Sequence, residues 1–389
     1  MDKFDIEVRK HKFILFCVDF YNPLGILRSL GEVGITPVTV ILNDRKIFLL
    51  NHSKFLKEYT LVDSIEEGYN LILEKYGSEE FRPFIISCDD KIESYYDNHY
   101  EEMKDKFYFF HGRQQGIINY YMNKDNINKI AVECGFRIPQ AEVLQRGEYP
   151  KHLQYPVITK TIASTVGGWK NDVFICNTKE ELSDAYTKIK APLLIVEEYI
   201  RKKTEFCFDA FCINNGEDVC IPFVEDYIRV PYDSYGLYMN VIPFQDDEMK
   251  AKVEKILRTI GYTGIFEVEF MVGPNDEVYF LEVNFRNSGW GHIVTYGGVN
   301  MPYLWAKSTL AGHLCIEGLN IREPFTAMVE PTDFKLSVLR DKQVTFFQWL
   351  KDLRNCDYLI YYQKNDKLPA FYKLMHDMTG IIKRKFRIK

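Results

Sequence analysis

The chain of 389 residues lacks the features of several large protein classes. It contains no uninterrupted run of 18 apolar residues, so we expect no transmembrane segment. Its first residues, MDKFDIEVRKHKFILF, carry charges where a signal peptide needs an apolar stretch. The formal net charge of −6 gives no overall attraction to nucleic acid. We therefore expect a soluble, cytoplasmic protein with no nucleic-acid partner.

The nine cysteines form no CxxC pair and no Cys/His spacing typical of a zinc site. An odd, scattered set is typical of reduced thiols and not of a disulfide framework. The first predicted strand is not followed by G-x-G-x-x-G, which argues against dinucleotide binding there. We also find no internal repeat and no low-complexity linker. What remains is a globular composition, with 46% hydrophobic residues.

Strands and helices alternate in the first part of the chain. Residues 13–20, FILFCVDF, form a short apolar strand, and a helix over 22–34 has proline in its first turn. Further strands follow at 36–42 and 83–90. This alternation predicts a small parallel sheet with Rossmann-like winding, which we assign to a domain over residues 1–120.

The middle of the chain predicts an α+β domain over residues 121–320, in subdomains of about 121–200 and 201–320. Its clearest element is a β-hairpin over 264–286, whose turn is Gly-Pro-Asn-Asp. Residues 321–389 predict a C-terminal helical extension that ends in KRKFRIK. A basic end is usually a solvated terminus, and an anchor for anionic lipid or polymer is the alternative.

Polar residues alternate along the predicted hairpin. Glu267 and Glu269 share one face of its first strand, and Glu282 and Asn284 share one face of its second. If these faces coincide, carboxylates about 4 Å apart repel by roughly 4 kcal/mol at an effective dielectric near 20. A cation is therefore expected there. The simpler alternative is that Arg286 and a lysine neutralise the carboxylates on a solvated face.

Carboxylate and amide oxygens are hard ligands suited to Mg²⁺ or Mn²⁺, and magnesium held by few protein oxygens usually also binds phosphates. Lys160 ends the apolar strand YPVITK, where a cation is costly unless it faces an anion. The following STVGGWK offers Ser164, Gly167 and Gly168 to a phosphate, although such a loop is more often a plain turn. Together these residues predict a nucleotide as partner.

The order of Lys124, Lys160 with its glycine loop, EEYI, EVEF and LEVNFR resembles the ATP-grasp family. The resemblance spans about residues 1–320. It implies a fold of mixed α/β and α+β class, in which a Rossmann-like pre-ATP-grasp domain precedes two subdomains that close on ATP.

The resemblance also implies roles for individual residues. Lys124 and Lys160 would hold the ATP phosphates, and Arg286 would face the transferred phosphoryl group. Glu269, Glu282 and Asn284 would bind two Mg²⁺ ions, with Glu267 as a competitor of Glu269. The expected contacts to adenine and ribose are Glu197, the backbone of Tyr199 and Ile200, and Glu205.

The activity implied is that of an ATP-dependent carboxylate–amine ligase, similar to D-aspartate ligase-like enzymes of cell-envelope assembly. Such enzymes form an acyl phosphate and then an amide, releasing ADP and phosphate. Candidate substrate contacts are Arg229, Asn287, Ser288 and His292, and His292 is also a candidate base. The alternatives are a structural ion pair for Arg229 and a structural hydrogen bond for His292.

Other functions stay open from the sequence. One is a nucleotide-binding scaffold without turnover, and another is a carboxylating enzyme similar to carbamoyl-phosphate synthase or biotin carboxylase. The expected partners are a small-molecule carboxylate and a small-molecule amine. A homodimer is a further hypothesis from the sequence.

Overall fold

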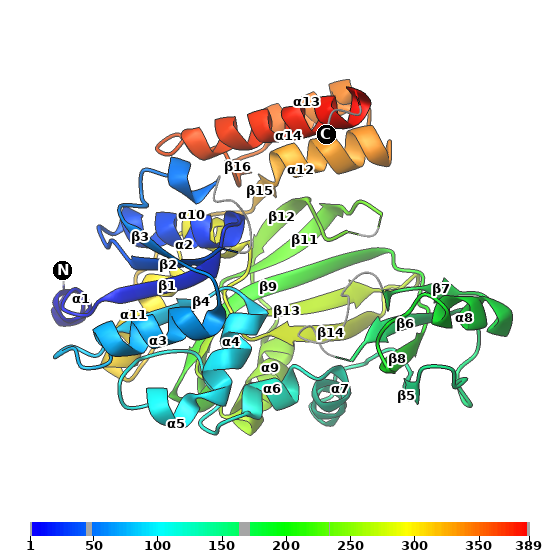
Figure 1. The fold of residues 1–389 in the computed structure, drawn as a ribbon, viewed down its shortest axis with the longest axis horizontal. Helices are drawn as coiled ribbons and strands as arrows, with labels where there is room; N and C mark the ends of the chain where they lie inside the picture. Colours follow the sequence, from blue (N-terminus) through cyan, green and yellow to red (C-terminus); the bar gives the residue numbers. More distant parts are fainter. Residues whose placement is uncertain (1, 44–48, 163–171, 233, 387–389) are drawn as a thin grey trace.

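The computed structural model describes residues 2–43, 49–162, 172–232 and 234–386, with side chains through residue 379. Three sheets organise this part of the chain (Figure 1). No helix among these residues is both long and apolar enough to cross a bilayer.

The first sheet is parallel, in the order β3-β2-β1-β4. Its elements are β1 (Phe13–Val18), α2 (Tyr21–Glu32), β2 (Val38–Leu42), β3 (Tyr59–Val62), α3 (Ile65–Tyr76), β4 (Phe84–Ser87) and α4 (Asp90–Asn98). Because strand side chains alternate between faces, β1 places Leu15 and Cys17 in one core and Ile14 and Phe16 in another. A parallel sheet buried on both faces confirms the predicted Rossmann-like winding.

The second sheet is small and antiparallel, in the order β5-β8-β6-β7. It follows the short helices α5 (Tyr100–Met103), α6 (Ile117–Tyr121) and α7 (Lys124–Glu133). Its elements are β5 (Ala141–Gln145), β6 (Val157–Thr161), β7 (Ile175–Cys176), α8 (Lys179–Tyr186) and β8 (Leu193–Glu198). Val157, Leu182 and Leu194 belong to a core of its own. This sheet therefore forms a separate lobe, at the right of Figure 1.

The third sheet is the largest, in the order β14-β13-β9-β11-β12-β15-β16, with β10 paired to β9. Its central elements are β9 (Thr204–Ile213), β10 (Asp218–Cys220), β11 (Phe223–Arg229), β12 (Tyr238–Pro243), α9 (Asp247–Ile260), β13 (Gly264–Val272) and β14 (Val278–Asn284). The predicted hairpin is confirmed as β13–β14. Helix α9 ends at Gly261, whose φ of 72° is the left-handed conformation that favours glycine at a helix end.

The C-terminal segment corrects one expectation. It follows α10 (Gly291–Tyr296) and α11 (Met301–Ala311), and its own helices are α12 (Glu330–Asp333), α13 (Phe346–Asn355) and α14 (Leu368–Phe386), with a π-helical turn over Phe334–Arg340. Two strands, β15 (Phe325–Met328) and β16 (Tyr358–Leu359), also extend the large sheet from β12. Residues 321–389 are thus not purely helical. The sequence did not predict these strands because they are too short to show an alternating pattern.

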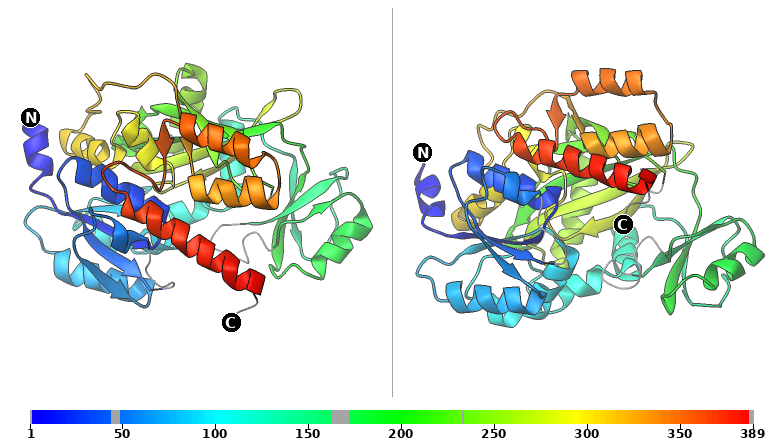
Figure 2. Two further views of the ribbon diagram at one scale, coloured as in Figure 1. Left: turned by 90° about the horizontal axis from the view of Figure 1, so that it is seen from above. Right: turned by 45° about the horizontal axis from the view of Figure 1, so that its top comes forward.

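One core joins the first sheet, the large sheet and the C-terminal segment. It includes Leu24 from α2, Phe211 from β9, Phe266 from β13 and Tyr361 beyond β16. Figure 2 shows α13 and α14 lying across this body, while the small sheet projects from it. The hairpin thus lies between a large rigid body and a separate lobe. The domain bounds at residues 120, 200 and 320 stay predictions.

Candidate active site

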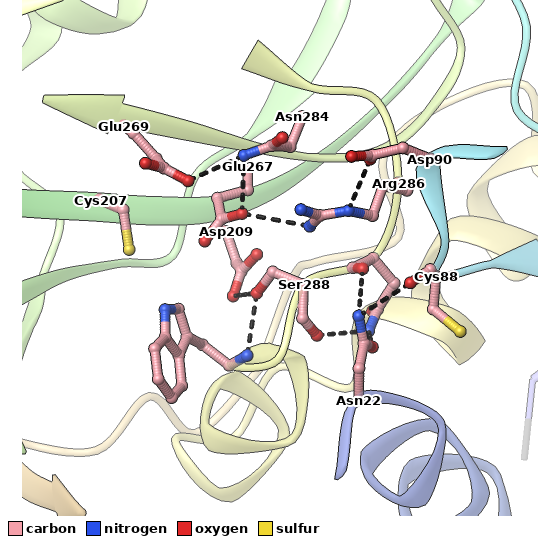
Figure 3. A network of polar contacts seen from close by, with 12 residues as sticks. Asn22, Cys88, Asp90, Cys207, Asp209, Glu267, Glu269, Asn284, Arg286 and Ser288 are labelled. Atoms are coloured by element: carbon pink, nitrogen blue, oxygen red, sulfur yellow. Dashed lines mark hydrogen bonds and ion pairs between the residues drawn. The ribbon is translucent and has the colours of Figure 1, made fainter. Parts of the chain in front are cut away.

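The β13–β14 hairpin brings the predicted metal ligands onto one face, and Figure 3 shows two of them, Glu269 and Asn284, beside Glu267. Glu267 lies opposite Asn284, and Glu269 lies opposite Glu282. The intervening Val268 is buried in the core. The polar faces of the two strands coincide because the register shifts by one residue between Glu269 and Phe270.

The carboxyl groups on this face influence one another. The Asn284 amide nitrogen donates to Glu267 Oε2 at 3.1 Å and to Glu269 Oε1 at 2.9 Å. Burial, followed by the charges of Glu282 and Glu267, raises the pKa of Glu269 well above its ordinary value. The pKa of Glu282 is lowered, because Lys124 forms an ion pair with it. Negative charge on this face thus exceeds what its cations balance.

Arg286 is held between the hairpin and the first domain. Its Nη1 donates to Glu267 Oε2 at 3.2 Å, and its Nε donates to Asp90 Oδ1 at 3.0 Å. Burial lowers the pKa of Arg286, but Asp90 and Glu267 outweigh burial and raise it overall. The guanidinium therefore stays charged beside the acids, at the position where the sequence predicts a phosphoryl contact.

Two lysines approach the acids from separate elements. Lys124 begins α7, and its backbone N–H donates to the carbonyl of Ile162 at 2.8 Å. Burial lowers the pKa of Lys124, but the charge of Glu282 outweighs it and raises the value. Lys160 on β6 forms an ion pair with Glu197 on β8, and its charge also lowers the pKa of Glu282. The structure thus brings both lysines to the acidic face.

A pocket opens beside Lys124 and β14. Its walls come from α4, the segment around α6, α7 and the second strand of the hairpin. The residues that line it are Asp90, Tyr121, Met122, Lys124, Ile127, Glu282, Val283, Asn284 and Phe285. A ligand in this pocket would therefore meet both Lys124 and Glu282.

The donor chemistry of the acidic face fits a divalent cation. Glu269, Glu282 and Asn284 offer hard oxygen ligands, which Mg²⁺ and Mn²⁺ prefer. No three His, Cys, Asp or Glu side chains among the described residues are arranged as a ready-made metal site. Glu282 instead pairs with Lys124, and Asn284 presents its amide nitrogen to the acids. A half-turn of the Asn284 amide would present oxygen instead.

The predicted nucleotide contacts lie where the small sheet passes into the large one. The backbone N–H of Tyr199 donates to the Pro156 carbonyl at 2.9 Å, so that donor is already used and only the Tyr199 carbonyl is left for adenine. Ile200 follows between β8 and β9, and Glu205 on β9 pairs with Lys202 at 2.9 Å. The predicted phosphate contacts Ser164, Gly167 and Gly168 lie outside the described residues.

Asn287 and Ser288 join the hairpin to neighbouring elements and do not face open space. Both side chains are 1% exposed. Asn287 donates to the side chain of Asn22 at 2.8 Å, and Ser288 donates to Asp209 Oδ2 at 2.7 Å (Figure 3). Because these bonds fix the loop after β14, their predicted contact with a substrate carboxylate is corrected to a structural role.

Arg229 and His292 are not brought to the hairpin face. Arg229 is buried and pairs with Asp333 and Asp352 in the C-terminal segment. His292 is 4% exposed, with Nδ1 bonded to the Tyr358 hydroxyl and Nε2 3.2 Å from Glu32. Burial lowers the pKa of His292. Both substrate predictions are corrected, since these side chains are already engaged inside the protein.

The sequence prediction missed two buried acids that continue the acidic face. Asp209 on β9 lies opposite Glu267, and Glu225 on β11 lies opposite Cys207 of β9. Burial raises the pKa of both carboxyls well above their ordinary values. Asp209 Oδ1 and Glu225 Oε1 have no hydrogen-bond partner within the part of the chain that is described. Alternating polarity in both strands was visible, but only the strand order places these acids beside Glu267.

Aromatic rings lie beside this row of acids. The Trp290 indole donates to the Tyr227 hydroxyl at 3.1 Å, and that hydroxyl lies 3.1 Å from Cys207 Sγ. The rings of Tyr21 and Tyr235 lie 6.1 and 5.8 Å from the Trp290 ring. A side chain at Gly289 would approach the Tyr21 ring at 2.4 Å, which explains a glycine in this loop. The acids therefore have an aromatic wall on one side.

Comparisons with known proteins agree on one domain type. A family model described as the ATP-grasp domain matches residues 131–301. N5-carboxyaminoimidazole ribonucleotide synthase from Staphylococcus aureus is 29% identical over 143 residues, which is 36% of this chain and 37% of that protein. The matched stretch therefore spans little more than a third of this curated relative.

Solved structures with the same fold cover more of the chain. N5-carboxyaminoimidazole synthetase from Staphylococcus aureus matches with a TM-score of 0.64 at 16% identity, over 84% of both chains. L-amino acid ligase from Bacillus licheniformis matches with a TM-score of 0.62 at 13% identity, over 81% of this chain and 79% of that one. At these identities the likeness concerns the fold, and it extends well beyond residues 131–301.

Proposed function

We propose that this chain, whose residues 131–301 match the ATP-grasp domain, is an ATP- and Mg²⁺-dependent ligase that joins a carboxylate to an amine. The observation that carries this proposal is the pairing of Glu269 with Glu282, with Lys124 and Lys160 close to the same face. Acids in excess beside lysines suit a site that binds a divalent cation together with phosphates.

ATP would lie between the small sheet and the hairpin. Lys124 and Lys160 would bind its phosphates, with Ser164, Gly167 and Gly168 from the intervening loop. The adenine would meet Glu197, Tyr199 and Ile200, and Glu205 would meet the ribose. The ion pairs of Lys124 with Glu282 and of Lys160 with Glu197 would then give way to phosphate contacts.

The proposed ligands for the cations are Glu269, Glu282 and Asn284. Glu269 is preferred to Glu267 because Glu267 Oε2 already accepts hydrogen bonds from both Asn284 and Arg286. Bound Mg²⁺ or Mn²⁺ would neutralise charge on the phosphates of ATP. Lys160 and Arg286 would add positive charge where the phosphoryl group moves.

The reaction would have two steps. A carboxylate oxygen of the substrate attacks the γ-phosphorus, the bond to ADP breaks, and an acyl phosphate forms. The amine nitrogen then attacks the acyl carbon, phosphate leaves, and the nitrogen gives up a proton as the amide forms. Arg286, which pairs with Glu267 and Asp90, would orient the transferred group.

We propose that the amine binds beside Asp209 and Glu225. These acids extend the acidic face and have oxygens able to accept hydrogen bonds from an amine. We propose that the substrate is an amino acid or a cell-envelope compound and that the enzyme acts in the cytoplasm. We also propose that it forms a homodimer, which light scattering would measure.

Magnesium-dependent ADP release across a panel of carboxylates and amines tests this function. We expect release only when Mg²⁺, a carboxylate and an amine are all present. Release with bicarbonate in place of the organic carboxylate would indicate a carboxylating enzyme, and ATP binding without release across the panel would favour a scaffold. Glu248→Gln on α9, where the side chain is 80% exposed, is the matched control for glutamate variants in the site.

A further inference from the structure

Helix α14 turns an apolar face to the solvent. Leu368 and Phe371 are 61% and 63% exposed, and Leu374, Met375 and Met378 are each about half exposed. Positions 368, 371, 375 and 378 follow each other at spacings of three and four, so their side chains form one stripe along the helix. This stripe, Leu368–Phe371–Met375–Met378 with Leu374 beside it, is called the α14 stripe below.

The polarity of α14 is the reverse of an ordinary surface helix. Its ion pair between Lys373 and Asp377 is largely buried, with 16% and 15% of the side chains exposed. Lys373 Nζ also lies 5.6 Å from the centre of the Tyr361 ring, within the protein. A surface helix usually buries its apolar stripe and exposes its charges. An outward apolar stripe of this kind indicates that something covers it in the working protein.

The charge beyond the stripe indicates what covers it. After Asp377 the sequence holds no acid and five basic residues, in KRKFRIK. The chain as a whole has a net charge of −6, so this end is opposite in sign to the overall charge. An amphipathic helix with an apolar stripe followed by lysines and arginines is typical of helices that lie in the surface of an anionic membrane.

A second copy of the chain fits this face less well. The stripe runs over eleven residues, or about 16 Å of helix at 1.5 Å per residue. A stable protein interface buries about 800 Å² on each partner, which a stripe one helix wide and about 16 Å long does not supply. Two basic ends brought together would also repel each other.

We propose that α14 docks this protein on an anionic lipid surface, with the α14 stripe inserted among the acyl chains. The helix lies on the outside of the molecule, beside α12 (Figures 1 and 2). The inference does not rest on the proposed function.

Co-sedimentation of the full-length protein with vesicles tests the proposal. We expect binding to vesicles that contain phosphatidylglycerol, at least about tenfold weaker binding to phosphatidylcholine alone, and release by salt. The double variant Phe371→Ser/Met375→Ser should lose at least about tenfold in affinity, since both side chains are exposed and the fold does not depend on them. Phe347→Ser on α13, where Phe347 is 79% exposed, is the matched control and should bind like wild type.

Three results would overturn it. These are no binding to phosphatidylglycerol vesicles, equal binding by wild type and the double variant, and equal binding to the two lipids. A dimer that the double variant converts to a monomer, with no vesicle binding by either form, would assign the stripe to a second copy instead. Thermal melting of both variants with and without ATP separates these outcomes from a folding defect or a damaged ATP site.

Discussion

Two of the places where this molecule buries charge differ in how that charge is balanced. At the junction of the first domain with the C-terminal segment, Arg28 donates to Asp366 and to the carbonyls of Ile360 and Tyr361. Asp366 also accepts hydrogen bonds from Ser53 and from the backbone of Lys54. On the hairpin face, by contrast, Glu269 and Glu282 lie opposite each other.

The difference shows which kind of burial marks a site. The junction matches each cation to acids and carbonyls, as Arg229 does with Asp333 and Asp352, and this matching holds elements together. The hairpin face leaves one oxygen each of Asp209 and Glu225 without a partner in the described chain, and burial raises the pKa of both carboxyls. Buried side chains with an excess of one sign of charge indicate a ligand site more strongly than buried charge that is balanced.

The largest expected effect is on the hairpin. Glu282→Gln should lower ADP release by roughly a thousandfold or more, because the variant loses a cation ligand and the partner of Lys124. Steady-state ADP release with saturating substrates measures it, beside the Glu248→Gln control. Near wild-type rates in Glu282→Gln would remove this residue from the site.

A substitution at the junction should lower the stability of the protein instead of its activity. Arg28→Met leaves Asp366 buried without its cation, which typically costs about 3–5 kcal/mol in the free energy of unfolding. Urea denaturation measures the loss. The control is Arg258→Met, which removes an exposed ion pair in which Arg258 lies 3.5 Å from Glu217, and it should change stability by less than about 1 kcal/mol. An equal effect of the two variants would contradict the structural role of Arg28. The KM for ATP of the folded Arg28→Met protein should stay unchanged.

The hairpin should also show a pH dependence that Mg²⁺ reverses. The folded-state pKa of Glu269 is raised above the ordinary 4.5, so the native state holds this proton more tightly than the unfolded state. Stability from this group is therefore complete below about pH 4.5 and is lost as pH rises through the folded-state pKa. Because Mg²⁺ needs the ionised carboxylate, its affinity should rise over the same range.

Thermal melting from acid to alkaline pH, with and without Mg²⁺, measures this dependence. Glu269→Gln should flatten the curve recorded without Mg²⁺ and abolish the stabilisation by Mg²⁺. A wild-type curve that Mg²⁺ leaves unchanged at every pH would argue against a cation on this face.

The smallest expected effect concerns Asp209. Burial raises the pKa of its carboxyl and asparagine is nearly isosteric with aspartate, so Asp209→Asn should change stability by less than about 1 kcal/mol. If the row of acids receives the amine, the KM for the amine should rise about tenfold, equivalent to about 1.4 kcal/mol, with kcat little changed. A KM unchanged for every amine tested would place the acceptor elsewhere.

The hairpin site was the part of the molecule most accessible from the sequence. Alternation of period two predicted that Glu267 shares a face with Glu269 and that Glu282 shares a face with Asn284, but the pairing of Glu269 with Glu282 depends on a register shift next to Phe270 that the sequence does not show. Local rules predict the hairpin itself because neighbouring strands joined by a tight turn must pair.

Residues whose setting depends on distant segments were not predictable in this way. Arg229 and His292 have the residue types of substrate contacts, but the C-terminal segment covers them through Asp333, Asp352 and Tyr358. Asp209 joins the acidic face only because β9 pairs with β13, a pairing across more than fifty residues. Burial and strand order are tertiary properties that local patterns do not contain.

The central claim is that the hairpin acids hold a divalent cation beneath ATP. Calorimetric titration of a non-hydrolysable ATP analogue, with and without Mg²⁺, tests it in wild type and in Glu269→Gln/Glu282→Gln. The account predicts Mg²⁺-dependent binding by wild type and at least about a hundredfold weaker, Mg²⁺-independent binding by the variant. Equal affinity in the two proteins, or wild-type affinity that does not respond to Mg²⁺, would contradict it.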